Sequence, residues 1–127
     1  MDRKGFTLIE LLTVLAIVAT LLTIAAPRYF ASIDRSKEAV LKENLFQMRD
    51  AIIKYHADKG GYPESLQALA IEQYLRKIPI DPITQSAATW IAVPLAEPGK
   101  AGEKPGVFDV RSGAPGKGLD GSEFNTW

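Results

Sequence analysis

The stretch GFTLIELLTVLAIVATLLTIAA, residues 5–26, contains one charged side chain, that of Glu10. From Phe6 onwards a helix of this length is about 31 Å long, which is enough to cross the hydrocarbon core of a membrane. Arg3 and Lys4 precede the run, and by the positive-inside rule they keep the N-terminus in the cytoplasm. The sequence therefore predicts one membrane-spanning helix over residues 6–26, with the rest of the chain outside.

A cleaved secretory signal is the alternative explanation of this run. The apolar part of such a signal is usually about 7–15 residues long and ends at a site with small side chains. Here the run is longer, and the candidate site at Ala25-Ala26 is followed at once by Pro27. A retained helix is the better interpretation.

Glu10 stands inside this apolar run and needs an explanation. A carboxylate near the middle of a membrane helix costs about 2.5–3.5 kcal/mol, and less near the helix end. We therefore expect Glu10 to have a partner or a task. The alternative is a carboxylate that simply reaches the headgroup layer from the end of the helix.

The basic leader ending in Gly5, followed by FTLIE at residues 6–10, resembles the cleavage and methylation site of type IV pilin-like proteins. The resemblance implies that a membrane prepilin peptidase cuts between Gly5 and Phe6 and methylates the new amine. That amine is largely protonated at neutral pH. Glu10 lies one helical turn away and could pair with it in the same chain or in the next subunit of a bundle. In the second arrangement, Glu10 would set the register between neighbouring subunits during polymerisation.

The helical pattern continues beyond Pro27, which is expected to bend or loosen the helix locally. Apolar side chains at spacings of four and three then trace one stripe: Leu41, Leu45, Met48, Ile52 and Tyr55. Gly60 and Gly61 supply a stop signal. The sequence predicts one long helix from Phe6 to Lys59, its second half packed on a small domain.

Shorter elements follow the long helix. A short helix is predicted after Tyr62, with Leu66, Leu69 and Ile71 facing inward. The connector RKIPIDP, residues 76–82, is rich in turns because a proline denies helix to the residue before it. TWIAVPL (89–95) and GVFDV (106–110) predict two antiparallel strands, joined by the polar loop AEPGKAGEKPG (96–106). The remaining residues are irregular and rich in glycine.

Composition narrows the range of functions. The chain has 127 residues, no formal net charge and no cysteine, so disulfides and thiol nucleophiles are excluded. A zero net charge argues against non-specific electrostatic binding to nucleic acid. The one histidine, His56, has no partnered serine or cysteine, and we expect no enzyme.

Over nearly its whole length the chain resembles the major pseudopilin of type II secretion systems. Beside GFTLIE, the resemblance rests on the YP after the long helix, LRKIPIDP, FDVRSG, and Trp127 after an acidic, glycine-rich loop. It implies an α+β fold, in which a long N-terminal helix packs on a small antiparallel sheet, with an irregular C-terminal loop. The domains would be a leader (1–5), an assembly helix (6–26) and a periplasmic domain (27–127).

The function implied by this resemblance is polymerisation into a periplasmic pseudopilus anchored in the inner membrane. The implied partners are further copies of the chain, the prepilin peptidase, minor pseudopilins, an inner-membrane platform protein and an assembly ATPase. Two alternatives stay open. One is a type IV pilin for adhesion, motility or DNA uptake, and the other is an anchored binding domain that does not polymerise.

The resemblance also implies a calcium ion in the closing loop. Calcium takes about six to eight oxygen ligands from carboxylates, carbonyls and hydroxyls. The candidate side chains are those of Ser112, Asp120, Ser122 and Glu123, with carbonyls at Arg111 and Leu119. The alternative is a loop held by its own turns and by Trp127 packing inward.

Overall fold

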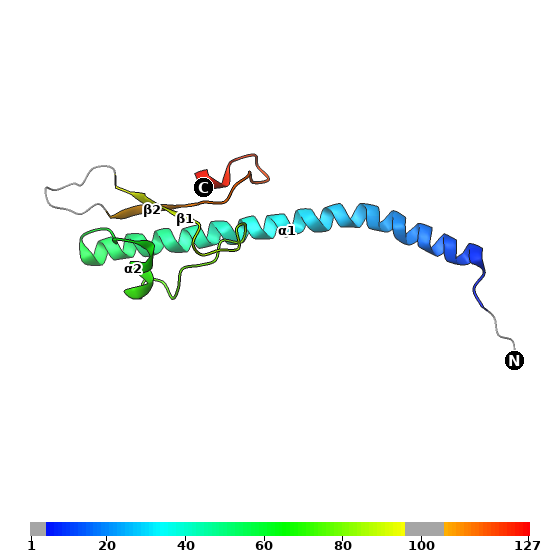
Figure 1. Cartoon of the computed structure of the whole chain (residues 1–127), viewed down its shortest axis with the longest axis horizontal. Helices are drawn as coiled ribbons and strands as arrows, with labels where there is room; N and C mark the ends of the chain where they lie inside the picture. The colour runs from blue at the N-terminus through cyan, green and yellow to red at the C-terminus, as the bar shows by residue number, and fades with distance from the viewer. Residues whose placement is uncertain (1–4, 96–105) are drawn as a thin grey trace. The chain divides into compact units, whose positions relative to one another are not determined.

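The computed structural model describes residues 5–95 and 106–127. All of the predicted loop 96–106 except Gly106 lies outside these residues. The chain divides into two units, Met1–Arg35 and Ser36–Trp127. The described elements, labelled in Figure 1 except for the last, are α1 (Leu8–Lys59), α2 (Leu66–Ile71), β1 (Trp90–Pro94), β2 (Val107–Ser112) and the short 3-10 helix η1 (Phe124–Thr126). The predicted α+β fold is confirmed.

Helix α1 begins at Leu8, two residues later than predicted, because Thr7 caps it. The Thr7 hydroxyl accepts a hydrogen bond from the Glu10 amide at 3.2 Å, as an N-cap residue does from just outside the helix. Pro27 lies inside α1 without ending it. Gly60 follows the last residue with a φ of +75°, the left-handed conformation that glycine adopts easily at a helix end.

The core of the second unit is built on the predicted stripe of α1. Leu41, Leu45, Met48 and Ile52 are buried, and Tyr55 is partly buried against them. Side chains of the other elements complete the core: Leu66, Leu69, Trp90, Val107, Val110, Ala114 and Phe124. The strands β1 and β2 lie along the C-terminal half of α1 (Figure 1).

Helix α2 buries two of the three side chains expected to face inward. Leu66 and Leu69 are buried, three residues apart on one face of the helix. Ile71 is 78% exposed, so its predicted inward position is wrong. The reason is helical geometry, because a residue two positions beyond Leu69 points about 200° away from it.

Strands β1 and β2 pair in antiparallel fashion, as predicted. Their register places Trp90 opposite Ser112 and Ala92 opposite Val110, with an irregularity between Val93 and Pro94. Strand β2 continues to Ser112, two residues beyond the prediction. The extension brings the Ser112 hydroxyl into the buried interior, where it meets the connector.

The connector that follows α2 is fastened by the fully buried Asp81. Its Oδ1 accepts hydrogen bonds from the amides of Ile83 at 2.8 Å and Thr84 at 3.3 Å, and its Oδ2 accepts one from the Ser112 hydroxyl at 2.7 Å. Two neighbouring contacts hold the same segment: Asn44 donates to the Ile80 carbonyl, and the Trp90 indole donates to the Pro79 carbonyl. A buried carboxylate is tolerated here because its charge is met by three donors.

Candidate functional site

The predicted cleavage position lies before the first residue of α1. Phe6 is 88% exposed and, like Gly5 and Thr7, lies outside helix and strand. A β-carbon added at Gly5 would meet no described atom within 4 Å. The fold described here therefore gives no reason for glycine at this position, whereas close approach of a protease to the backbone does.

Glu10 and Thr7 form a reciprocal capping box at the start of α1. The Glu10 Oε2 accepts a hydrogen bond from the Thr7 amide at 3.2 Å, and the Thr7 hydroxyl accepts one from the Glu10 amide at 3.2 Å. Each side chain thus satisfies one backbone donor that a helix end leaves free. The T-x-x-E spacing was visible in the sequence, but we interpreted Glu10 only as a charge. Its pairing with the Phe6 amine stays a prediction, because Phe6 is in an internal peptide bond here.

The apolar part of α1 has the length and composition of a membrane-spanning helix, and none of its most apolar window is buried within the described chain. Its hydroxyls are satisfied within the helix: Thr13 donates to the Ile9 carbonyl and Thr20 to the Ala16 carbonyl, both at 2.7 Å. The helix therefore offers an apolar surface with few polar groups that need water.

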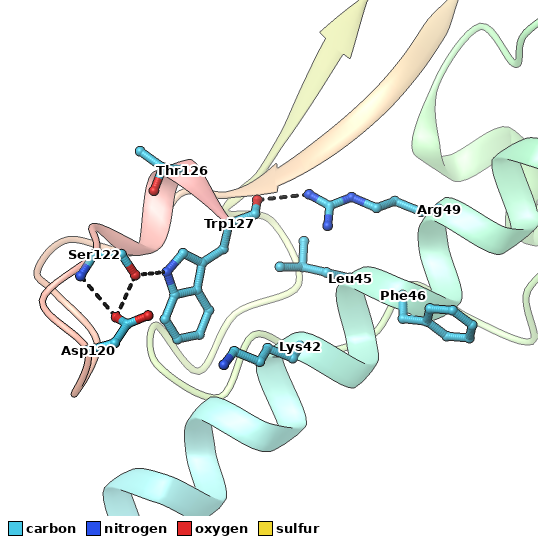
Figure 2. Close-up of a pocket in the computed structure, with 8 residues that line it drawn as sticks. All are labelled: Lys42, Leu45, Phe46, Arg49, Asp120, Ser122, Thr126 and Trp127. Atoms are coloured by element: carbon cyan, nitrogen blue, oxygen red, sulfur yellow. Dashed lines mark hydrogen bonds between the residues drawn. The ribbon is translucent and has the colours of Figure 1, made fainter.

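The loop that follows β2 is closed around Trp127 (Figure 2). The Trp127 indole donates to the Ser122 hydroxyl at 2.6 Å, and that hydroxyl donates to the Asp120 Oδ1 at 2.6 Å. The Ser122 amide donates to the same Oδ1 at 2.9 Å. These two bonds from Ser122 stabilise the carboxylate form and lower the pKa of Asp120 below its ordinary value. The alternative prediction, Trp127 packing inward, agrees with its partial burial beside the core.

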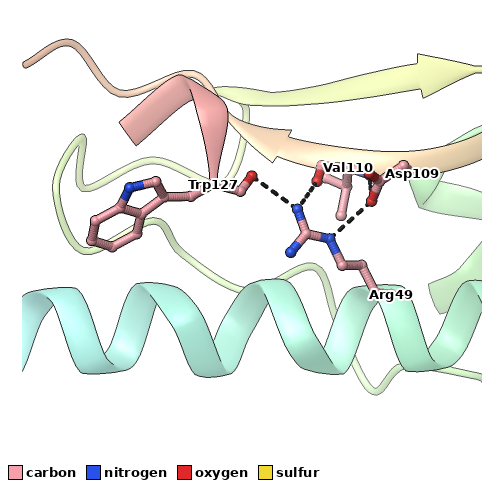
Figure 3. Close-up of polar contacts among 4 residues, drawn as sticks. All are labelled: Arg49, Asp109, Val110 and Trp127. Carbon is pink, nitrogen blue, oxygen red and sulfur yellow. Dashed lines mark hydrogen bonds and ion pairs between the residues drawn. The ribbon is translucent and has the colours of Figure 1, made fainter. Parts of the chain in front are cut away.

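Arg49 of α1 joins three parts of the same unit (Figure 3). Its Nε donates to the Asp109 carboxylate at 2.8 Å, and its Nη2 donates to the carbonyls of Val110 at 2.9 Å and Trp127 at 2.8 Å. The planar guanidinium fork suits such multiple contacts. We did not single out Arg49 from the sequence, since nothing in the local pattern distinguishes it from other charged residues on α1.

Two of the hydroxyls proposed for calcium, those of Ser112 and Ser122, are bonded to partners in the chain. The Ser112 hydroxyl donates to Asp81 and accepts from the Ala114 amide, and the Ser122 hydroxyl lies between Asp120 and Trp127. Among the residues that the structure describes, no group of three or more His, Cys, Asp or Glu side chains could hold a metal ion. The ligand atoms that these residues offer therefore fit calcium poorly.

The candidate ligands have their contacts in different parts of the unit. Ser112 is buried at the end of β2, whereas Leu119, Asp120 and Ser122 lie near α1 and Trp127. Calcium at this loop stays a prediction that a titration has to decide.

His56 lies outside any site that these contacts define. It is exposed and stacks on the Tyr62 ring with centroids 4.3 Å apart.

The chain is similar to a fimbrial protein and to core proteins of type II secretion systems. The prokaryotic N-terminal methylation motif family matches residues 1–26. Fimbrial protein EcpC of Eikenella corrodens is 32% identical over 94% of this chain and 78% of the relative. Type II secretion system core protein G is 28% identical in Pseudomonas aeruginosa, over 64% of this chain and 68% of the relative. The core protein G of Klebsiella michiganensis is 24% identical over 91% and 88%. No solved structure matches the chain.

Proposed function

The chain belongs to the type IV pilin-like family, and we propose that it is the major pseudopilin of a type II secretion system. In this role a prepilin peptidase cuts after Gly5 and methylates Phe6. The helix of residues 6–26 holds the subunit in the inner membrane, with its N-terminus in the cytoplasm. Copies then leave the membrane and bundle these helices into a periplasmic filament.

The proposal rests mainly on the uncovered apolar helix. This helix directly follows the exposed Gly5-Phe6 bond, in a chain that aligns with core protein G almost from end to end. Lipid covers such a surface while the subunit is in the membrane. Outside the membrane only other apolar surfaces can cover it, and further copies of the same helix supply them.

The remaining partners follow from the proposed role. An assembly ATPase would drive polymerisation through a platform protein in the inner membrane, and minor pseudopilins would join the filament. The growing filament would push or gate folded proteins through an outer-membrane secretin. The task of the chain itself is structural, and no chemical step is assigned to it.

A type IV pilin is the second candidate, favoured by the similarity to the fimbrial protein of Eikenella corrodens over nearly the whole chain. A pilin would form fibres on the cell surface and serve adhesion, motility or DNA uptake. An anchored domain that does not polymerise would keep its leader and form no fibre.

The test is deletion of this gene in its host, followed by complementation. N-terminal mass spectrometry of the complemented membrane fraction is expected to find methylated Phe6 as the first residue. Loss of exoproteins from the medium on deletion, with surface fibres intact, supports the pseudopilin. Loss of surface fibres with normal secretion would assign the chain to a pilus. A chain that still begins at Met1 in a host with active prepilin peptidase would reject both.

A further inference from the structure

One face of α1 carries the groups that hold the closing loop. Glu38, Lys42 and Arg49 are spaced by four and seven residues, so they lie on the same side of the helix. All three belong to the second unit and contact the segment from Leu119 to Trp127. This face adjoins the buried stripe, since Leu45 contributes both to the core and to the wall beneath Trp127.

Each of the three residues makes a different contact with the segment. The Glu38 carboxylate accepts from the Leu119 amide at 2.6 Å. The Lys42 ammonium lies over the Trp127 ring, 4.8 Å from its centroid. The Arg49 guanidinium donates to the Trp127 carbonyl while it pairs with Asp109 of β2. The loop is thereby joined at both of its ends to the same helix.

Lys42 and Arg49 also place positive charge beside the closing loop. Both line a hollow of about 590 Å³ that Asp120, Ser122 and Trp127 border on the other side (Figure 2). Asp120 is the one acidic residue among its lining side chains, and the charge of Lys42 contributes to lowering its pKa. A divalent cation entering this hollow would meet Lys42, the ion pair of Arg49 with Asp109, and the carboxylate of Asp120, so the charge of Lys42 opposes its binding.

We infer that Lys42 and Arg49 close the C-terminal loop onto α1 in place of a metal ion. Lys42 and Asp120 line the same hollow, and the hydroxyls of Ser112 and Ser122, two of the ligands proposed for calcium, are bonded within the chain. The domain then closes equally well at any calcium concentration. This inference stands for a secretion pseudopilus and for a pilus alike.

The test measures amide hydrogen exchange of the full chain in detergent micelles, in chelator and in millimolar calcium. The peptide to follow is 117–127, where the amides of Gly118, Leu119, Ser122, Phe124 and Trp127 are hydrogen-bonded. We expect its exchange to be the same in both buffers. Lys42→Met is expected to speed exchange about threefold, and Lys42→Arg is expected to keep it near the wild-type rate.

Lys54→Met is the matched control, because Lys54 is an exposed cation on α1 that pairs along the helix, with Asp50 at 2.8 Å. The core peptide of residues 41–52 reports whether a variant has unfolded, and we expect it to stay protected in each variant. Slower exchange of the loop in calcium than in chelator would overturn the inference. So would a Lys42→Met chain whose loop exchanges no faster than that of Lys54→Met.

Discussion

Glu10 accepts a hydrogen bond from the Thr7 amide in the uncleaved chain, and cleavage after Gly5 would create a charged amine one turn away. Capping needs only an oxygen acceptor at this position, whereas pairing with the amine needs a negative charge. A glutamine keeps the first property and lacks the second, since Gln also serves in capping boxes. The two roles of this residue are therefore separable.

We expect Glu10→Gln to insert and be cleaved normally but to assemble poorly. Filament yield should fall by a factor of about 10 to 150, the equivalent of losing a charge-assisted hydrogen bond of about 1.5–3 kcal/mol. Filaments are sheared from cells and quantified, with insertion checked in the membrane fraction. Glu10→Val is the comparison, because it loses both roles. A normal yield from Gln together with a low yield from Val would assign Glu10 to capping alone.

Asp81 is a second residue whose role depends on its neighbours. It is fully buried and accepts hydrogen bonds from two amides of its own turn and from Ser112, which lies on β2. Removing the carboxylate leaves these donors without an acceptor in a place that water reaches poorly.

We expect Asp81→Ala to lower the free energy of unfolding of the second unit by about 3 kcal/mol. Denaturation of the full chain in detergent measures this change, followed by tryptophan fluorescence, to which the buried Trp90 and the partly buried Trp127 of the same unit contribute. Asp34→Ala, at an exposed position of α1, should change stability by less than about 0.5 kcal/mol. Ser112→Ala should lower the free energy of unfolding less in the Asp81→Ala chain than in the wild-type chain, because its partner Asp81 is already missing there. Full additivity would contradict the hydrogen bond between them.

At the scale of elements, α2 shows how a six-residue helix depends on packing. An isolated helix of this length is not stable in water, because nucleation is costly. It is held by Ser65, whose hydroxyl accepts from the Ala68 amide at 3.2 Å, and by the burial of Leu66 and Leu69. At its C-terminal end, Glu72 pairs with Lys59 of α1 at 3.0 Å, which raises the pKa of the lysine.

Two leucine-sized residues of α2 should therefore respond differently to truncation. Leu69→Ala removes a fully buried side chain and is expected to cost about 2–5 kcal/mol. Ile71→Ala, at a position 78% exposed, is expected to stay within about 0.5 kcal/mol. The free energy of unfolding of both variants is measured by tryptophan fluorescence during denaturation. Similar losses from the two would mean that Ile71 is covered in the folded chain.

At the scale of the whole molecule, processing is the event on which the proposed assembly depends. Gly5 and Phe6 lie outside α1. A β-carbon at position 5 would touch no described atom, so the fold does not require glycine there. A larger residue at position 5 should therefore leave folding intact and disturb only the fit to the peptidase.

We expect Gly5→Leu to accumulate in the membrane at full mass, with Met1 retained, and to form no filament. Mass spectrometry of the extracted protein reports cleavage. Tryptophan fluorescence during denaturation reports whether the free energy of unfolding is unchanged. Asp2→Asn, a change elsewhere in the leader, should be processed normally. Filaments built from uncleaved Gly5→Leu subunits would show that assembly needs no new amine.

Much of this protein was predictable from sequence because the deciding interactions are local. The long helix, its apolar stripe, the stop at Gly60, the two strands and the α+β class all follow from the spacing of side chains along a few turns or residues. The Gly5-Phe6 processing motif is local in the same sense, and it stays a prediction about an enzyme outside this chain. The capping box was equally visible in T-x-x-E, although we missed it.

Other features were decided only by the tertiary structure, because they join residues far apart in the chain. Asp81 meets Ser112 across 31 residues, and Arg49 meets Trp127 across 78. No periodicity or spacing marks such pairs, since each polar group finds its partner only after the core has brought their segments together. Calcium at the closing loop, which the resemblance implies, stays a prediction. Of the oxygens proposed for it, the Ser112 hydroxyl is bonded to Asp81, a partner that the sequence could not place beside it.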